Sequence, residues 1–419
     1  MPGRTARVAG LLLLTSVALG LPACDLLDVE NNPKTVPADE LNNPTSLPAR
    51  LIGAEANFFF AYDMAIVYGG LFTDELIDAT GFTQVAERRV TADNGAVGST
   101  DEAPEGIDGL WTPMQRAAAV TDQLQEDLLG DNFPDRVPDP SNSPELARIS
   151  LFAGYTKLML ADEFCTLAFG GAGPELTSQE TYALAADEFT LAIEAENATD
   201  EVRSAALVGR ARARLQMGDE DGALADARQV PADFEYIADV YSNNSQTEEN
   251  DLWNMMFDSQ RFSVAEAYRN PLVDGTGSPD PRVQTQLDPG NGVGSDGITP
   301  MWQALKYGSA ISPIRLASGD EARYIIAEIV GGQEAVDIIN AIRAEYGISE
   351  RFASTDSEAI QSKVREEKER TLFLEGQRMG DLRRYLDRYG VNLFPTGPTF
   401  GDQTCMPLPN AERDNNPDL

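Results

Sequence analysis

The side chains that could do chemistry in this chain are carboxylates, because Asp and Glu number 68 while histidine is absent. Without histidine, the commonest general base and the commonest zinc ligand are missing. A Ser-His-Asp or Cys-His catalytic arrangement is therefore excluded. Hydrolysis by two carboxylates remains open, but among so many acids no spacing singles out one pair. The chain also lacks a glycine-rich phosphate loop and the motif set of a kinase.

An acidic, glycine-rich stretch between Asp288 and Asp296 has the oxygen ligands that Ca²⁺ prefers. It lacks the spacing and the closing Glu of an EF-hand loop. We therefore interpret the acidity as solvated surface and expect no metal or other cofactor, with a Ca²⁺ site as the alternative. The net charge of −36 repels nucleic-acid phosphates and argues against a nucleic-acid partner.

Residues 1–23 have the features of an export signal, since two arginines precede an apolar run that ends in small residues. The small Ala23 stands directly before Cys24, and polar chain follows at once. This order is typical of a lipoprotein signal, in which the cysteine is acylated (palmitate among the chains) and becomes the new N-terminus. Two or three acyl chains would anchor the protein stably, with 24–45 as a tether. The alternative is an ordinary secretory signal with an incidental cysteine.

The remaining cysteines, Cys165 and Cys405, would be exported with the chain into an oxidising compartment. We expect them to form a disulfide, which would stabilise the fold by roughly 4–5 kcal/mol in the chain-entropy model. Two free, buried thiols are the alternative.

Hydrophobic periodicity predicts a mostly α-helical protein. A first helix should run from Ser46 to Gly69, where two glycines are expected to end it. Helix pairs follow over about 145–234, with small residues at helical spacing, a Gly-Asp turn and a closing proline. These features are typical of a tetratricopeptide repeat (TPR), although an unrelated helical hairpin would share them. A second group spans about 318–389, including one long helix from about Asp356 to Tyr389, apart from Gly376 and Gly380.

Between these groups, at about 235–312, helical periodicity fades and aromatic residues alternate with Gly, Pro, Asn and Asp. We call this segment the insert and expect an irregular subdomain, rich in loops, within the helical scaffold. Loops on a rigid scaffold commonly carry binding sites.

Several segments, taken together, resemble the SusD/RagB family. In chain order they are Cys24-Asp-Leu-Leu-Asp, Gly70-Leu-Phe-Thr-Asp-Glu75, Pro313-Ile-Arg315 with Tyr324-Ile-Ile-Ala-Glu328, Ala335-Val-Asp-Ile-Ile-Asn-Ala-Ile-Arg343, Arg370-Thr-Leu-Phe-Leu-Glu-Gly-Gln-Arg-Met-Gly-Asp-Leu-Arg-Arg384 and Met406-Pro-Leu-Pro. Each match is weak alone, but together they span the chain from Cys24 onward in the family's order. In the 370–384 segment, which we call the signature, Thr371 replaces the usual Glu.

Charged residues of the signature are spaced three apart, at Glu375, Arg378, Asp381 and Arg384. On one continuous helix this spacing would let them pair with each other or clamp neighbouring helices. We interpret the signature as a packing motif and not as a catalytic one.

The resemblance implies a non-catalytic outer-membrane lipoprotein on the cell exterior. Such a protein binds glycan or peptide nutrients and partners a SusC-like TonB-dependent transporter. Sugar recognition needs aromatic platforms and polar contacts. Our candidate platforms are Phe82, Trp253, Tyr268, Trp302 and Tyr307, and our candidate polar contacts are Asp78 and Arg282. Trp253 and Trp302 are preferred because they lie in loop-rich sequence, whereas an aromatic residue is more often part of the core.

Two other functions remain open on the sequence. A repeat protein that only organises other outer-membrane proteins would share the TPR-like part. A surface glycosidase would need a pair of carboxylates that the sequence does not single out.

Overall fold

A long helix, α2 (Leu47–Phe72), runs through the core, and its C-terminal half is almost completely buried. The computed structural model describes residues 44–80, 109–130, 133, 137–170, 172–238, 249–275, 277–395 and 403–417. Residues 44–419 form one unit, and Cys24 and the signal segment lie outside the described residues. None of the described helices combines the length and the apolar character needed to cross a membrane.

The prediction that Gly69 and Gly70 end the first helix is wrong, since α2 continues to Phe72. A Cβ on Gly69 would lie 2.5 Å from Oε1 of Glu163, and one on Gly70 would lie 3.0 Å from Leu76. These glycines therefore allow close packing within the helix and do not terminate it.

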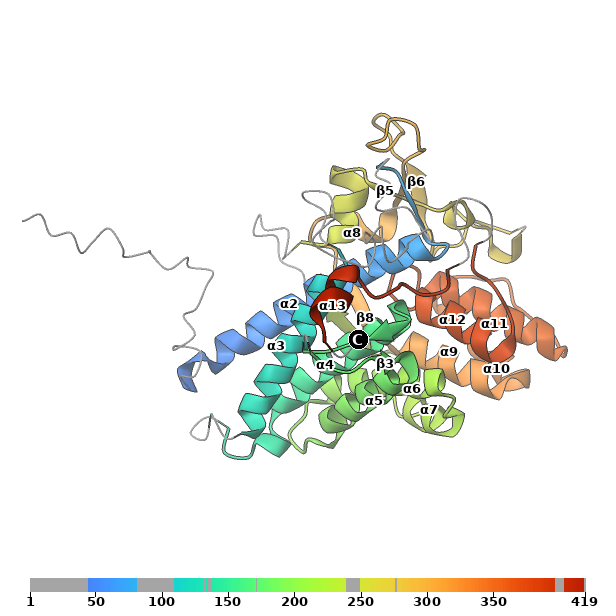
Figure 1. Cartoon of the computed structure of the whole chain (residues 1–419). Helices are drawn as coiled ribbons and strands as arrows, with labels where there is room; N and C mark the ends of the chain where they lie inside the picture. Colours follow the sequence, from blue (N-terminus) through green and yellow to red (C-terminus); the bar gives the residue numbers. More distant parts are fainter. Residues whose placement is uncertain are drawn as a thin grey trace, which may run out of the picture. The chain divides into compact units, whose positions relative to one another are not determined.

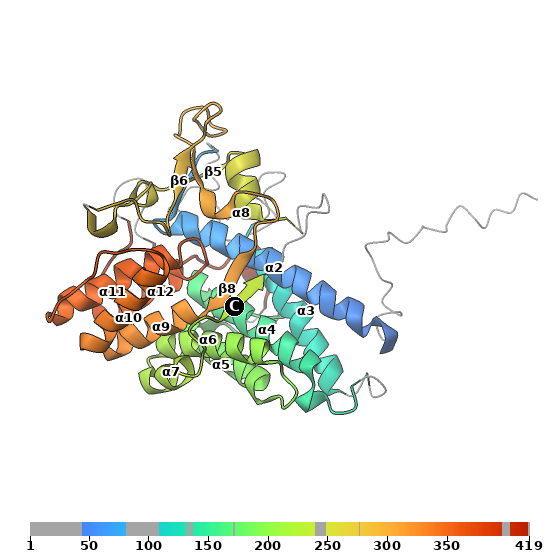
Figure 2. The same cartoon turned by 180° about the vertical axis from the view of Figure 1, so that it is seen from behind.

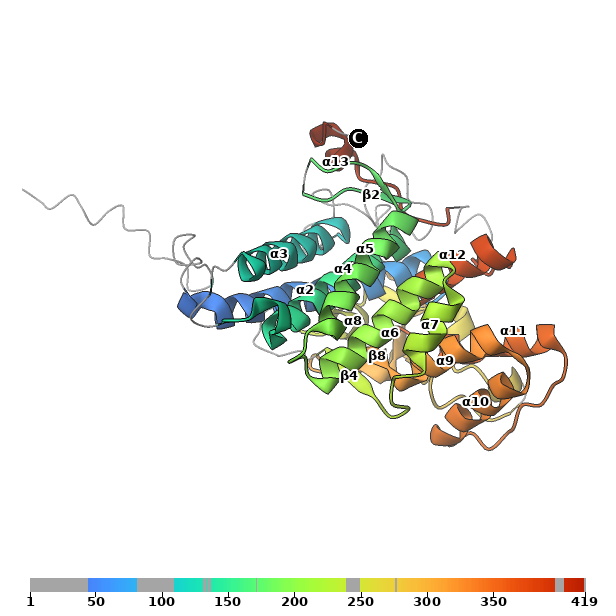
Figure 3. The same ribbon diagram turned by 90° about the horizontal axis from the view of Figure 1, so that it is seen from below.

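The predicted helix pairs of 145–234 are confirmed. Five helices pack in succession after α2: α3 (Trp111–Leu129), α4 (Pro144–Glu163), α5 (Ser178–Glu194), α6 (Asp200–Met217) and α7 (Glu220–Ala227). Figure 3 shows α4 to α7 side by side. Local sequence defines their ends: Ser143 and Thr199 cap helix N-termini through their hydroxyls, and Gly218 ends α6 with a φ of 87°.

A second helical group continues this layer, because α9 (Gly319–Val330) packs on α6 and α7. It also contains α10 (Gly332–Glu345), α11 (Ser357–Thr371) and α12 (Arg378–Tyr389). The single helix predicted over 356–389 is therefore wrong. The chain turns between α11 and α12, with Leu374 at a φ of 55° and Gly376 at 74°. This turn is held against α2, since Tyr62 donates its hydroxyl proton to the carbonyl of Glu375 at 2.9 Å.

The break in the helix changes the role of the signature charges. Arg384 does pair with Asp381 three residues earlier, at 2.8 Å. Glu375 lies in the turn and pairs instead with Arg315 and Lys306, and Arg378 reaches Asp74 at the end of α2. The signature is a packing motif, as predicted, but mostly between segments far apart in the chain.

The strands are short and form four antiparallel pairs among the described residues. They are β1 (Leu76–Asp78) with β5 (Phe262–Val264), β2 (Thr166–Leu167) with β3 (Leu176–Thr177), β4 (Glu235–Ala238) with β8 (Ile314–Ser318), and β6 (Thr285–Leu287) with β7 (Trp302–Ala304). The β4–β8 pair joins the two ends of the insert. The insert, with β5, β6, β7 and α8 (Asp251–Trp253), lies on the opposite side of α2 from helices α4 to α7 (Figures 1 and 2).

The C-terminal segment returns to the end of α4, as the predicted disulfide requires. Cys165 and Cys405 are bonded, with their Cα atoms 5.1 Å apart. The backbone N–H of Cys165 also donates to the carbonyl of Met406 at 2.9 Å. The short helix α13 (Asn410–Asn415) follows.

Candidate functional site

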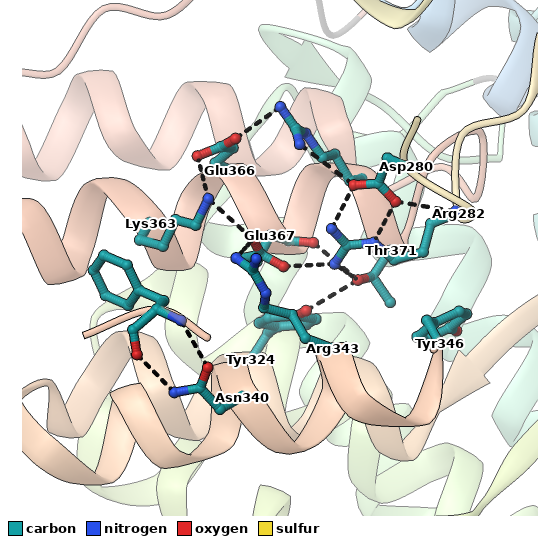
Figure 4. Close-up of polar contacts among 12 residues, drawn as sticks. Asp280, Arg282, Tyr324, Asn340, Arg343, Tyr346, Lys363, Glu366, Glu367 and Thr371 are labelled. Atoms are coloured by element: carbon teal, nitrogen blue, oxygen red, sulfur yellow. Dashed lines mark hydrogen bonds and ion pairs between the residues drawn. The ribbon is translucent and has the colours of Figure 1, made fainter. Parts of the chain in front are cut away.

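A network of buried charges fastens the insert to the second helical group (Figure 4). Arg282 of the insert binds Asp280 through Nε and Nη2, at 2.9 and 2.6 Å, and Glu367 of α11 through Nη1, at 2.7 Å. Arg343 of α10 donates to the same Glu367 at 3.0 Å and to Asp274 of the insert at 2.8 Å. Opposite charges therefore alternate through the network, and each buried ion has a partner.

This network engages Arg282, one of the candidate polar contacts, which also lies among the residues that line the cavity described below. Its side chain is 1% exposed, and its guanidinium nitrogens are occupied by Asp280, Glu367 and the hydroxyl of Thr371. Thr371, where a Glu is usual in the family, also hydrogen-bonds to Tyr324 at 2.9 Å. Arg282 therefore positions the insert and does not face the solvent.

Tyr268 and Tyr307 are core residues, so neither offers a ring face as a ligand platform. Tyr268 is 3% exposed and stacks on Phe373, with ring centroids 4.7 Å apart. Tyr307 is 1% exposed and donates its hydroxyl proton to the carbonyl of Leu374 at 2.8 Å. Both rings pack the insert against the turn that separates α11 from α12.

The two preferred platforms, Trp253 and Trp302, are partly exposed. Trp253 ends α8, where its backbone N–H donates to the side chain of Asn250 at 2.9 Å. Trp302 begins β7, and its backbone N–H donates to the hydroxyl of Ser263 on β5 at 2.8 Å. Both indoles therefore belong to ordered parts of the insert and retain solvent-facing surface.

Asp78 is also partly exposed, at the end of β1. It lies opposite Phe262 of β5, and β5 in turn contacts β7, the strand that carries Trp302. One carboxylate oxygen of Asp78 accepts from the N–H and hydroxyl of Thr80, at 2.8 and 2.7 Å. The remaining candidate, Phe82, lies outside the described residues.

A polar cavity of about 370 Å³ opens where the insert meets the scaffold. A second cavity, of about 190 Å³, shares Glu235, Arg315 and Tyr346 with it. Inside, Arg315 donates to Glu375, Glu235 and Asp320, at 3.0 to 3.2 Å. Because this guanidinium is already paired with carboxylates, the cavity offers a ligand little uncompensated charge.

Two carboxyls with raised pKa values, Asp63 and Glu75, are buried. Burial raises the pKa of Asp63 to about 7 and that of Glu75 to about 8. Asp63 accepts a hydrogen bond from the backbone N–H of Asp251 at 3.0 Å, and Glu75 accepts one from Leu374 at 2.8 Å. Asp63 and Glu75 are 3% and 2% exposed. A pKa near neutrality suits an acid catalyst only where a substrate can reach it, so we assign these acids to structure.

The predicted acidic loop uses its own carboxylates to stabilise its turns. Asp288 accepts from the backbone N–H groups of Gly290, Asn291 and Gly292, at 3.2 to 3.3 Å. Asp296 accepts from Ile298 and Thr299, each at 2.9 Å. Within the described part of the chain, no group of three or more Asp, Glu or Cys residues is arranged to hold a metal ion.

Sequence reasoning missed two residues beside Trp302, Arg269 and Leu287, and the exposed Ile298 in the loop between β6 and β7. The guanidinium carbon of Arg269 lies 5.6 Å from the centroid of the indole ring. Leu287 lies directly opposite Trp302 in the β6–β7 pair and is 46% exposed, and Ile298 in the connecting loop is 79% exposed. The alternating pattern of a strand pair would have placed Leu287 beside Trp302, but only if β6 and β7 had been recognised.

Neither family models nor the curated proteins match this sequence, but solved structures do match the fold. A SusD superfamily protein from Bacteroides vulgatus has a TM-score of 0.65 at 14% identity, over 90% of this chain and 97% of its own. One from Parabacteroides distasonis has a TM-score of 0.65 at 13% identity, over 89% and 98%. Surface glycan-binding protein A from Bacteroides uniformis has a TM-score of 0.60 at 14% identity, over 90% and 99%. The chain therefore has the fold of the SusD superfamily, as its sequence motifs implied.

Proposed function

We propose that this protein is a non-catalytic glycan-binding lipoprotein of the outer membrane and a member of the SusD/RagB family. The observation that carries the proposal is the match in fold, over 90% of this chain, to a protein named as a surface glycan-binding protein. Another protein of similar fold is described as a SusD-like carbohydrate-binding protein. Partly exposed tryptophans on the insert supply the apolar faces on which sugar rings pack.

In this proposal Cys24 carries the acyl anchor, the helical scaffold holds the insert rigid, and Trp302, Trp253 and Asp78 contact the glycan. A SusC-like TonB-dependent transporter would receive the bound sugar. No bond in the glycan is broken in this proposal, which agrees with the absence of histidine and with the burial of Asp63 and Glu75.

Binding is tested by isothermal titration calorimetry against a panel of purified polysaccharides, with product analysis of the same mixtures. We expect saturable binding to at least one glycan, weakened by Trp302→Ala or Trp253→Ala. Tyr307→Phe is the matched control, because that ring is buried and should leave affinity unchanged. Release of shorter sugars would contradict the proposal that the protein is non-catalytic. Binding of peptides alone would contradict the proposal that its ligand is a glycan.

The transporter is tested separately, by purifying the protein in mild detergent from the bacterium that makes it. A TonB-dependent barrel should be recovered with it in stoichiometric amount. Recovery of the lipoprotein without a barrel would favour a protein that acts alone.

A further inference from the structure

Arg269 stands beside the partly exposed Trp302, and no residue in the described part of the chain pairs with the ends of its guanidinium group. Its Nε donates to the backbone carbonyl of Val264 at 3.0 Å, and the group lies over the Trp302 ring, 5.6 Å from the centroid. Neither Nη1 nor Nη2 forms a hydrogen bond or ion pair with any residue that the structure describes. The Nε side of the guanidinium group is thus fixed by the backbone and the ring. The two terminal nitrogens, which form a planar fork, have no partner among the described residues.

The chain has 68 acidic residues for 32 basic ones, yet no carboxylate among the described residues pairs with the guanidinium group of Arg269. Arg282 and Arg343, for comparison, place both terminal nitrogens on acceptors within the protein. Burial lowers the pKa of Arg269, and nearby Glu266 only partly offsets this. Arg269 is therefore partly buried but, unlike those two arginines, has no carboxylate partner among the described residues.

Apolar surface continues from Trp302 next to this fork. Leu287 is the cross-strand partner of Trp302 and is 46% exposed. A pyranose ring could rest its C–H face on this surface. A planar, bidentate anion on the same ring would match the unoccupied guanidinium fork, because Arg recognises carboxylate and sulfate-like groups through two parallel hydrogen bonds.

We propose that Arg269 and Trp302 form a subsite for an acidic sugar residue, one that carries a carboxylate or a sulfate ester. The inference rests on the proposed glycan-binding function and narrows its ligand class. A neutral sugar would leave the fork unpaired and would gain only the contact with the ring. Since the net charge of −36 repels anions at long range, selection of an acidic glycan must come from short-range pairing at such a site.

The test uses the full protein on a glycan array that carries neutral galactan, galacturonan, alginate and carrageenan, with affinities then measured by calorimetry. We expect an acidic glycan to bind at least tenfold more tightly than the neutral one, and Arg269→Gln to remove that preference. Arg269→Lys, which keeps the positive charge but loses the planar fork, should retain only part of the preference for the acidic glycan. Galacturonan and alginate carry carboxylates and carrageenan carries sulfate, so the preferred polymer identifies the anion.

Arg228→Gln is the control, because Arg228 lies on the scaffold in an exposed pair with Glu334. It should change neither affinity nor preference, and circular dichroism should show every variant folded. Binding of neutral and acidic glycans with equal affinity, unchanged by Arg269→Gln, would overturn the inference while leaving glycan binding intact. Binding of polyglutamate but of no glycan would overturn both the inference and the proposed function.

Discussion

Among single residues, Asp63 is expected to make the stability of the protein depend on pH. Burial raises its pKa from 3.8 to about 7. Between these values the folded protein holds a proton that the unfolded chain releases, so the free energy of unfolding falls as pH rises through this window. Above about pH 7 the free energy of unfolding falls no further from this group, because Asp63 is then ionised in both states. Asp63→Asn keeps an oxygen for the N–H of Asp251 and should raise the free energy of unfolding at pH 8 by roughly 1–3 kcal/mol.

Urea unfolding at pH 4, 6 and 8 measures this effect. The gain from Asp63→Asn should grow with pH, whereas exposed Asp187→Asn should give a small and constant difference. An equal gain from Asp63→Asn at all three pH values would show that Asp63 is not the titrating group.

Arg282 is a second residue whose role can be separated from ligand binding. Its replacement by Gln leaves Asp280 and Glu367 buried, with side chains 0% and 1% exposed. Loss of one partner from a buried ion pair costs about 3–5 kcal/mol, whereas an exposed pair contributes about 0–1 kcal/mol. Chemical unfolding of Arg282→Gln and of Arg228→Gln should therefore give a large and a small loss. Equal losses would mean that the network of Figure 4 does not fasten the insert.

At the level of helices, some glycines allow close helix packing and others face open space, so the same replacement should have opposite effects on stability. The ring of Phe189 on α5 lies between Gly154 of α4 and Gly209 of α6, and a Cβ on Gly209 would lie 2.3 Å from it. A Cβ on Gly53 of α2 would have no neighbouring atom within 4 Å. We expect Gly209→Ala to destabilise the fold by about 1–3 kcal/mol. The same change at Gly53 should stabilise it by up to about 1 kcal/mol, because Ala favours the helix.

Thermal unfolding of the two variants compares these effects directly, since both replacements add the same methyl group to a helix. A rise in Tm for both would show that α5 and α6 can move apart to accept the methyl group at little cost.

The helix ends that the sequence could predict are those set by neighbouring residues in the chain. The helix pairs from Pro144 to Ala227 are bounded by Ser, Thr and Asp caps and by Gly218, all of which act through local chemistry. The end of α2 and the break before α12 depend on distant partners instead. Gly69 faces Glu163, and the turn at Leu374 is held by Glu75 and Tyr307. Such contacts are invisible to a pattern read along one segment.

The candidate site was predictable to a similar degree. The sequence located the insert and preferred Trp253 and Trp302, which are partly exposed. It could not distinguish them from Tyr268 and Tyr307, because aromatics that pack an irregular subdomain are interleaved with those that face solvent. Arg269 carried no signal, since its unoccupied fork is a property of three-dimensional surroundings.

For the molecule as a whole, charged cross-links between distant segments maintain the architecture. Arg378 joins the signature to Asp74 at the end of α2, and Arg384 joins it to Glu328 of α9. The first link joins residues 304 positions apart in the chain and the second joins residues 56 positions apart.

The attachment of the molecule to a membrane is the remaining prediction, and it depends on Cys24. Two or three acyl chains on this residue would hold the folded unit stably at a lipid surface. In a Gram-negative host, the wild-type protein should incorporate labelled palmitate and sediment with membranes, and Cys24→Ser should abolish both. Cys165→Ser breaks the disulfide but leaves the anchor, so it should keep the label. Palmitate retained in Cys24→Ser, or lost only in Cys165→Ser, would refute the assignment and leave residues 1–23 as an ordinary secretory signal.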